Sequence, residues 1–97
     1  MLALLSATVL IAHPTGLHAR PAVKLTKLAK GFQSRITLRP EGQDAWIDAK
    51  SIVKVMAMKA RQNSTLFVRA CGEDAEAAVA AVIHLVQRDF DEAGDGH

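Results

Sequence analysis

The stretch Thr15-Gly16-Leu17-His18-Ala19-Arg20-Pro21-Ala22 separates an apolar run from an amphipathic segment. Gly16 permits a tight turn, and Pro21 suits the first position of a helix, where a missing N–H costs nothing. His18 is therefore expected just ahead of a helix N-terminus. The unpaired N–H groups and the dipole at such an end favour an anion, and Arg20 adds a permanent cation. The stretch offers an imidazole nucleophile beside a place for a phosphoryl group, with an ordinary turn histidine as the alternative.

Hydrophobic periodicity on both sides of this stretch predicts four strands and three helices. Short alternating or β-branched runs predict strands at residues 8–12, 35–39, 45–49 and around 66–70. Helical spacing predicts helices at residues 19–30, from residue 51 to about 56, and from 75 to about 90. The order βαββαβα, with one apolar sheet face, indicates an α+β domain.

Alternation along the predicted strands assigns side chains to two faces of the sheet. The predicted core-facing positions are Val9, Ile11, Ile36, Leu38, Ala45, Ile47, Ala49, Leu66, Val68 and Ala70. The opposite face receives Leu10, Trp46, Asp48 and Phe67. Some of its three apolar residues are expected to meet in an exposed patch, with Trp46 at least partly exposed and contributing to weak self-association or to a second partner surface. The alternatives are a patch that only covers itself and a shifted third strand that buries Trp46.

Local signals predict several turns and helix ends. Ser51 and Asp74 are expected to cap the second and last helices, and Asn63 is expected to take a left-handed conformation. The apolar run at residues 2–12 is too short to span a bilayer and lacks a positive leading region. It is interpreted as a buried strand with a short apolar leader, while residues 91–97 are expected to form a frayed polar tail.

Composition indicates one globular domain over residues 1–97, with a core at about 7–90. Of the 97 residues, 49% are hydrophobic, and the single cysteine, Cys71, cannot form an intramolecular disulfide. The net charge is only +2, but residues 20–30 hold four cations and no acid, which favours an acidic partner. Few aromatic residues and no known motif argue against nucleic acid. His13, His84 and His97 lack metal-ligand spacing and are expected to be structural or on the surface.

Three stretches resemble one known family. Gly16-Leu17-His18-Ala19-Arg20-Pro21-Ala22 resembles the active-site motif of HPr, the histidine-containing phosphocarrier of the bacterial sugar phosphotransferase system. The segment from Asp48 to Met56 resembles its regulatory-serine segment, and Ala70-Cys71-Gly72-Glu73-Asp74-Ala75 its turn into the last helix. The resemblance covers residues 7–90 and implies an open-faced β-sandwich, a four-stranded antiparallel sheet with three helices on one face.

The resemblance also implies a function. His18 would accept a phosphoryl group on Nδ1 from phospho-enzyme I and pass it to the enzyme II A domains of sugar permeases in the cytoplasm. Such a carrier has no cofactor or metal, does not enter the membrane, and is an intermediate without turnover of its own. Arg20, Thr15 and the amide of Ala19 would stabilise the phosphoryl group. The alternatives are a regulatory or nitrogen-branch relative, and an unrelated basic binding domain.

Two further sets of residues follow from the resemblance. Ser51 matches a serine that a dedicated HPr serine kinase/phosphorylase modifies in some bacteria, with a plain N-cap serine as the alternative. A cationic rim around an apolar patch would dock partners. Its residues are Val23, Lys27, Lys30, Ile52, Val53, Lys54 and Met56. This chain departs from the family in a segment between Gly42 and Ser51 about two residues longer, and in Lys59 and Asn63 at positions where the family commonly has glycine.

Overall fold

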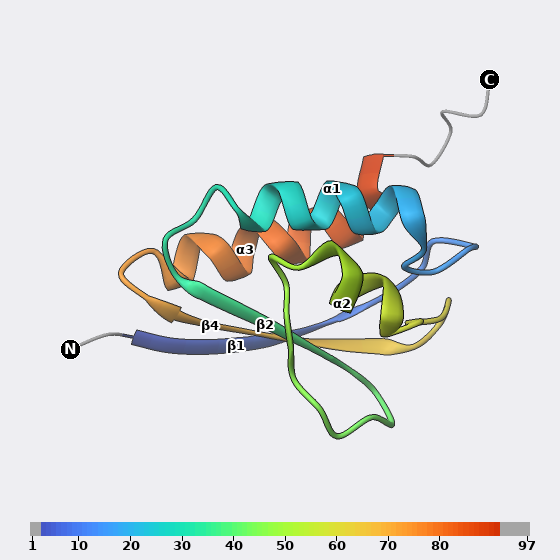
Figure 1. Ribbon diagram of the computed structural model, residues 1–97, viewed down its shortest axis with the longest axis horizontal. Coiled ribbons are helices and arrows are strands. Elements are labelled where there is room, and N and C mark those ends of the chain that lie inside the picture. The colour runs from blue at the N-terminus through green and yellow to red at the C-terminus, as the bar shows by residue number, and fades with distance from the viewer. Residues whose placement is uncertain (1–2, 92–97) are drawn as a thin grey trace.

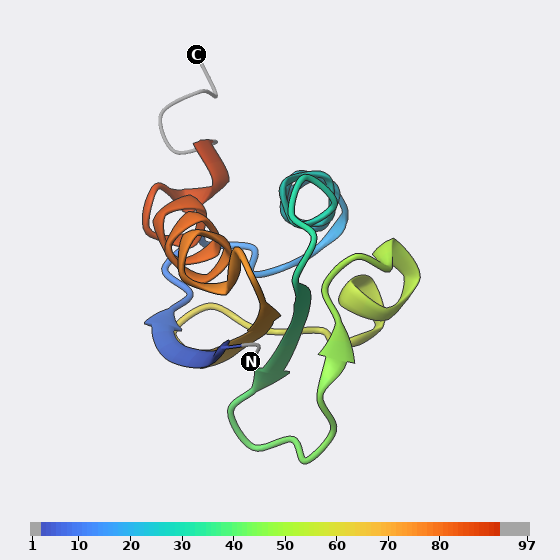
Figure 2. The same ribbon diagram turned by 90° about the vertical axis from the view of Figure 1, so that its left-hand side faces the viewer.

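The sheet is antiparallel, has four strands, and carries all three helices on one face (Figure 1 and Figure 2). The computed structural model describes residues 3–91. In chain order the elements are β1 (Ala3–Leu10), α1 (Ala19–Ala29), β2 (Arg35–Pro40), β3 (Ile47–Asp48), α2 (Ile52–Ala57), β4 (Thr65–Gly72), α3 (Ala75–Gln87) and a 3-10 turn (Asp89–Asp91). The strands lie in the order β1-β4-β2-β3. The predicted α+β class and open-faced sandwich are confirmed.

Strand β4 forms the centre of the sheet and sets its register. It pairs with β1 along its whole length, from Ala3 opposite Gly72 to Leu10 opposite Thr65. Its other edge pairs with β2, and β2 carries the two-residue strand β3. Because side chains alternate between faces, this register fixes which residues lie beneath the helices.

The core-facing assignments are confirmed at nine of the ten predicted positions. Eight of them are buried: Val9, Ile11, Ile36, Leu38, Ala49, Leu66, Val68 and Ala70. Ile47 is half-buried and packs against the same core. The inward prediction for Ala45 is wrong, because β3 begins only at Ile47 and leaves Ala45 exposed in the preceding loop. A strand with two paired residues holds its neighbours less firmly than the long β4.

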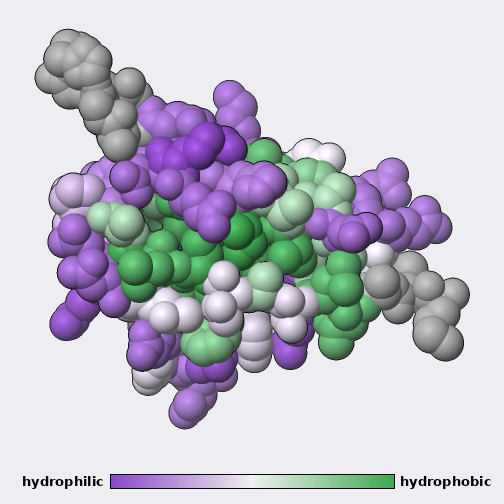
Figure 3. All heavy atoms as spheres, turned by 180° about the vertical axis from the view of Figure 1, so that it is seen from behind, coloured by the Kyte–Doolittle hydropathy of each residue, from purple (hydrophilic) through white to green (hydrophobic). Residues whose placement is uncertain are grey.

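The prediction of an apolar leader before β1 is wrong, because the strand begins at Ala3 and not at residue 8. Side-chain alternation is weak over these first residues, so local periodicity did not predict the added strand pairs. Strand β1 is an edge of the sheet, and three of its leucines are exposed: Leu4, Leu5 and Leu10. The side of the molecule formed by β1 and α3 shows a broad apolar area (Figure 3).

Asp74 takes the predicted N-cap position of α3, but its side chain does not cap the helix, which corrects that part of the prediction. Its side chain makes no hydrogen bond to the first turn of α3. Instead its carboxylate accepts hydrogen bonds from the amides of Gln33 (2.9 Å) and Ser34 (2.8 Å) and from the Ser34 hydroxyl. These contacts across the sheet lower the pKa of Asp74, the Ser34 hydroxyl bond most. The carboxylate therefore joins the loop after α1 to the start of α3.

Positive backbone φ angles mark the remaining turns. Asn63 has φ 68°, as predicted, and Lys59 has φ 53°, so both take the conformation that glycine adopts most easily. Phe90 follows α3 in the 3-10 turn, with φ 57° and a fully buried ring. Asp91, predicted to begin a frayed tail, instead accepts a hydrogen bond from Arg88. The remainder of that tail, residues 92–97, lies outside the described residues.

Candidate functional site

His18 is the residue on which helix α1 begins. It takes the N-cap position, with extended backbone angles, and its carbonyl accepts the Ala22 amide at 2.8 Å. Pro21 is the third residue of α1, not the first as predicted. It still lies in the first turn, where backbone N–H groups have no intrahelical acceptor, so its missing N–H breaks no helix hydrogen bond. The exposed imidazole of His18 makes no capping hydrogen bond, so its side chain is not committed to stabilising the helix.

The first turn of α1 provides a positive environment for this imidazole. Ala19 and Arg20 are both exposed there, and the turn contains no acidic residue. Helix N-terminal amides and the helix dipole attract an anion, and a guanidinium can bind phosphate oxygens in a bidentate way. The structure thus brings Ala19 and Arg20 to the same helix end as His18.

The loop before His18 is anchored by a tight backbone approach. Gly16 has φ 68°, and a Cβ atom there would collide with the carbonyl oxygen of Ala60. Next to it, the amide of buried Leu17 donates to that same carbonyl at 2.9 Å. Only glycine fits this position without strain, so the loop is held against the segment that follows α2.

His13, predicted to be structural or on the surface, lies inside the site. It is 8% exposed, and its ring centroid lies 6.2 Å from that of His18 and 6.1 Å from that of Phe90. Its Nδ1 accepts a hydrogen bond from the Thr15 amide (3.2 Å) and lies 2.8 Å from the Thr15 hydroxyl. Its position five residues before His18, in the same turn, was the available signal. The Thr15 hydroxyl therefore contacts His13.

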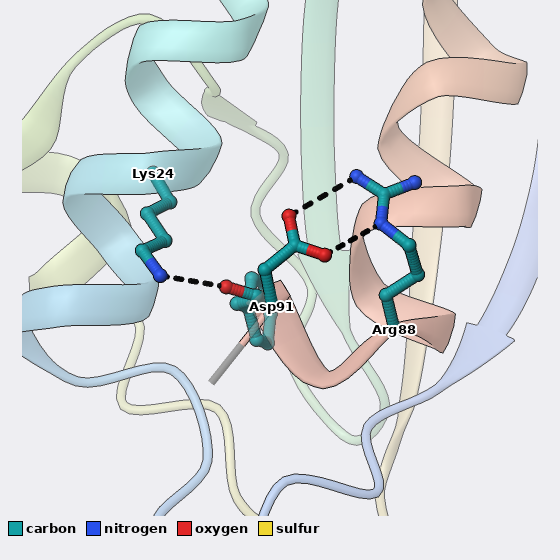
Figure 4. A network of polar contacts seen from close by, with 4 residues as sticks. Lys24, Arg88 and Asp91 are labelled. Atoms are coloured by element: carbon teal, nitrogen blue, oxygen red, sulfur yellow. Dashed lines mark hydrogen bonds and ion pairs between the residues drawn. The ribbon is translucent and has the colours of Figure 1, made fainter. Parts of the chain in front are cut away.

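The end of α3 closes the site from the other side. Lys24 Nζ donates to the carbonyl oxygen of Phe90 at 2.9 Å, and Arg88 Nε lies 2.8 Å from Asp91 Oδ1 (Figure 4). The hydrogen bond from Arg88 is the main cause of the lowered pKa of Asp91. Helix α1 is thereby tied to the turn whose Phe90 packs on His13.

The predicted docking residues gather along helices α1 and α2. A shallow cavity of about 290 Å³ is lined by Val23, Thr26, Lys27, Lys30 and Ile52. On α2, Val53 is 73% exposed and Met56 42% exposed. Lys27, Lys30 and Lys54 are exposed around them. Large exposed apolar side chains within a ring of cations are typical of a surface that binds acidic partners transiently.

Ser51 lies at the start of α2, beside this surface. Its hydroxyl accepts a hydrogen bond from the Lys54 amide at 3.3 Å, so the predicted N-cap is confirmed. Its half-buried position next to exposed Val53 means that a charge added there would face an approaching partner.

Across residues 3–91, no group of three or more His, Cys, Asp or Glu side chains has a metal-binding arrangement. Nor does any helix in this part of the chain have the length and apolar character needed to cross a bilayer. His84 is exposed on α3.

Comparisons with known proteins agree with this geometry. A family described as PTS HPr component phosphorylation site matches residues 5–88. The chain is 40% identical over 86 residues to phosphocarrier protein NPr of Escherichia coli (strain K12), covering 88% of this chain and 93% of that protein. It is 37% identical over 83 residues to phosphocarrier protein HPr of Xylella fastidiosa (strain 9a5c), covering 86% and 91%. The crystal structure of HPr-C-His from Thermoanaerobacter tengcongensis superposes with a TM-score of 0.83 at 33% identity, covering 91% and 97%.

Proposed function

The chain belongs to the HPr family of phosphocarrier proteins, and on that premise we propose that His18 is the phosphoryl acceptor of this phosphotransferase-system carrier. The observation that carries the proposal is an exposed imidazole at the N-cap of α1, beside Arg20 and a first turn without acids. Nucleophilic attack needs an unprotonated ring nitrogen. The proposed donor is phospho-enzyme I and the proposed acceptors are enzyme II A domains.

The proposed step exchanges one nitrogen–phosphorus bond for another. The lone pair of His18 Nδ1 attacks the phosphorus, the bond to the donor nitrogen breaks, and that nitrogen keeps the electron pair. The Arg20 guanidinium and the Ala19 amide stabilise the phosphoryl oxygens. When the next protein takes the group, His18 Nδ1 is the nitrogen that leaves and keeps the electron pair. The site therefore has to bind the phosphoryl group with only moderate strength. The chain acts as a stoichiometric carrier in the cytoplasm.

His13 has a supporting role in this proposal. Its Nδ1 accepts from the amide of Thr15, which fixes the turn three residues before His18. Its ring edge also contacts the His18 ring. His13 is thus a positioning residue. Thr15 contributes in two ways, because it contacts His13 and also lies near the proposed phosphoryl group.

The cavity between α1 and α2, with Val53, Lys54 and Met56, is the proposed docking surface for the donor and the acceptors. A phosphate on Ser51 would add a charge of about −1.5 to −2 at its edge. It would repel acidic partners there, while the positive end of α2 would stabilise it. Ser51 is accordingly a candidate regulatory site as well as an N-cap.

Transfer from purified enzyme I and radiolabelled phosphoenolpyruvate tests the proposal. The wild-type chain should gain one acid-labile, base-stable phosphate, and His18→Ala should gain none. The His13→Ala variant is the matched control and should still be labelled. Labelling of His18→Ala at the wild-type level would refute the assignment.

A regulatory or nitrogen-branch role is the second candidate, favoured by the 40% identity to NPr. The two candidates share the acceptor histidine and differ in the proteins that receive the phosphoryl group, sugar permeases or signalling proteins. Parallel transfer from the phosphorylated chain to an enzyme II A domain of a permease and to a signalling protein separates them, because the physiological acceptor should be phosphorylated faster.

A further inference from the structure

The open face of the sheet, opposite the helices, carries an unusual set of side chains. Arg35 and Arg39 of β2 and Arg69 of β4 point to this face, since the alternate residues Ile36, Leu38 and Ala70 are buried on the other. Trp46 crosses the face from the loop before β3, where it and Arg69 line the same hollows. The predicted partial exposure of Trp46 is confirmed, because its side chain is half-buried.

The arginines of this face are held by aromatic rings. The Arg69 guanidinium lies 4.0 Å from the centre of the Trp46 ring, and that of Arg39 lies 4.3 Å from the centre of Phe67 and 5.4 Å from Trp46. Stacking of this kind occupies the flat side of a guanidinium and leaves its N–H edge for other groups. A pre-ordered guanidinium loses little side-chain freedom when it binds a partner.

No carboxylate satisfies these cations in the part of the chain that the structure describes. Arg39 donates to the carbonyl oxygen of Gln43 at 2.7 Å, while Arg35 and Arg69 form no ion pair with any residue from 3 to 91. The acid nearest in register is Asp48, opposite Thr37, and its Oδ1 accepts the Lys50 amide at 2.9 Å. Asp48 shares this face but forms no ion pair with the three arginines among residues 3–91, so the cluster stays complementary to an anionic partner.

The face is also hollowed, and apolar groups line the hollows. One hollow of about 670 Å³ is bordered by Leu4, Arg35, Thr37, Trp46, Arg69 and Cys71. A second, of about 530 Å³, shares Leu4, Trp46 and Arg69 with it and extends to Phe67. Trp and Arg are the residues most enriched where protein interfaces bind most strongly. Arginines beside apolar hollows match a partner segment in which carboxylates alternate with apolar side chains.

We propose that this face, Arg35, Arg39 and Arg69 around Trp46 and Phe67, is a second docking surface that binds an acidic segment of a partner protein. Carboxylates match the guanidinium edge, and apolar side chains of the segment fill the hollows beside Leu4 and Cys71. Nucleic acid fits less well, because bases bind by stacking on open aromatic rings and both rings here already carry a guanidinium. The helices and His18 lie on the other side of the sheet, so both surfaces can be occupied together.

The test uses a labelled eight-residue peptide of alternating glutamate and leucine, with its glutamine–leucine counterpart as the neutral control. Fluorescence anisotropy should show salt-sensitive binding of the acidic peptide only. Arg69→Gln and Arg35→Gln should each weaken it by about tenfold or more, and Arg61→Gln, which removes an exposed arginine elsewhere, should not. Arg35 is exposed and stacks on no ring of residues 3–91, so its variant separates lost binding from lost folding.

A second measurement tests whether the peptide binds at the open face. Cys71, the only cysteine, lines the larger hollow, so bound peptide should slow its reaction with a thiol reagent. Absence of binding, binding insensitive to both Arg69→Gln and Arg35→Gln, or unprotected Cys71 would each overturn the proposal. Tighter binding of oligothymidylate than of the peptide would instead make the face a nucleic-acid surface. Phosphoryl transfer to His18 should be unchanged in both variants whichever result is found.

Discussion

The His18 end of α1 and the open face of the sheet both present arginine, but they hold it differently. Arg20 is exposed in the first turn of a helix, whereas Arg39 and Arg69 are half-buried on the sheet. Arg39 and Arg69 are stacked on Phe67 and Trp46. An exposed guanidinium can follow an oxygen that arrives and leaves, whereas a stacked one presents a fixed edge. The same residue type therefore suits brief phosphoryl stabilisation in one region and a standing contact in the other.

Replacing one arginine with alanine in each region should give the largest difference between the two regions, measured as the rate of phosphoryl transfer. Arg20→Ala removes a charge-assisted contact, which is worth about 1.5–3 kcal/mol and corresponds to a transfer rate about ten- to a hundredfold lower. Arg69→Ala should leave the rate within about twofold of wild type. Rapid-quench measurement of transfer from phospho-enzyme I checks both. Equal rates for Arg20→Ala and wild type would leave Arg20 without a role.

The loop before His18, unlike the open face, depends on one close backbone approach that only glycine makes without strain. Gly16→Ala forces a left-handed φ on alanine and drives its Cβ against the Ala60 carbonyl. Strain of this kind costs about 1–3 kcal/mol, so the free energy of unfolding should fall by that amount in urea denaturation. Gly42→Ala, also at positive φ but without a neighbour within 4 Å, is the control and should cost less. Identical losses would mean that the Ala60 contact is unimportant.

Charge reversal separates the two cationic surfaces by function. Lys27→Glu combined with Lys54→Glu should slow association with enzyme I by about tenfold at low salt, and the difference should shrink at high salt. Arg35→Glu adds the same kind of charge to the open face and should not alter this rate. Stopped-flow association at several salt concentrations distinguishes the cases, and a salt-independent defect would exclude the electrostatic explanation.

His13 offers a finer test of the loop. His13→Ala removes the acceptor for the Thr15 amide, a loss of about 1 kcal/mol that corresponds to about fivefold slower transfer. His13→Asn should restore much of the rate, because an asparagine oxygen accepts from the amide two residues on. A general structural defect would not distinguish the two variants. If alanine and asparagine behave alike in the transfer assay, the hydrogen bond is not what positions His18.

Asp74 tests the stability of the junction between the loop after α1 and the start of α3. Its pKa is lowered in the folded protein by the Ser34 hydroxyl and the Gln33 amide. The resulting stabilisation is present above the model-compound pKa of 3.8 and is lost as pH falls through the lower, folded value. The excess stability of wild type over Asp74→Asn should therefore shrink between pH 6 and pH 2.5, as followed by thermal melting, while Asp44→Asn controls for a lost surface carboxylate. A pH-independent difference would contradict this mechanism.

Much of the fold could be predicted because its signals are local. Alternation at Ile36 and Leu38 sets the face of β2, and the Ser51 hydroxyl needs only the amide of Lys54, three residues on. The motif around His18 likewise predicted the start of α1 within a few residues. The roles of His18 as acceptor and of Arg20 as its stabilising partner stay predictions.

The errors concern contacts that join distant segments. Asp74 was expected to bond its own helix, but its partners are some 40 residues away in sequence. Whether Ala45 faces the core depends on how far β3 pairs with β2. Where β1 starts depends on the length of β4. The proximity of His13 to Phe90 joins the two ends of the domain. The periodicity of one segment does not show which distant segment it pairs with.

The location of the phosphate is the most direct test of the central claim, because His13 and His18 lie side by side with ring centroids 6.2 Å apart. Phosphorylated protein labelled with ¹⁵N should be studied by NMR that detects phosphorus–nitrogen coupling. We predict a single coupling, to Nδ1 of His18, with the His13 ring shifted but not coupled. Coupling to a His13 nitrogen, or to no histidine, would contradict the account.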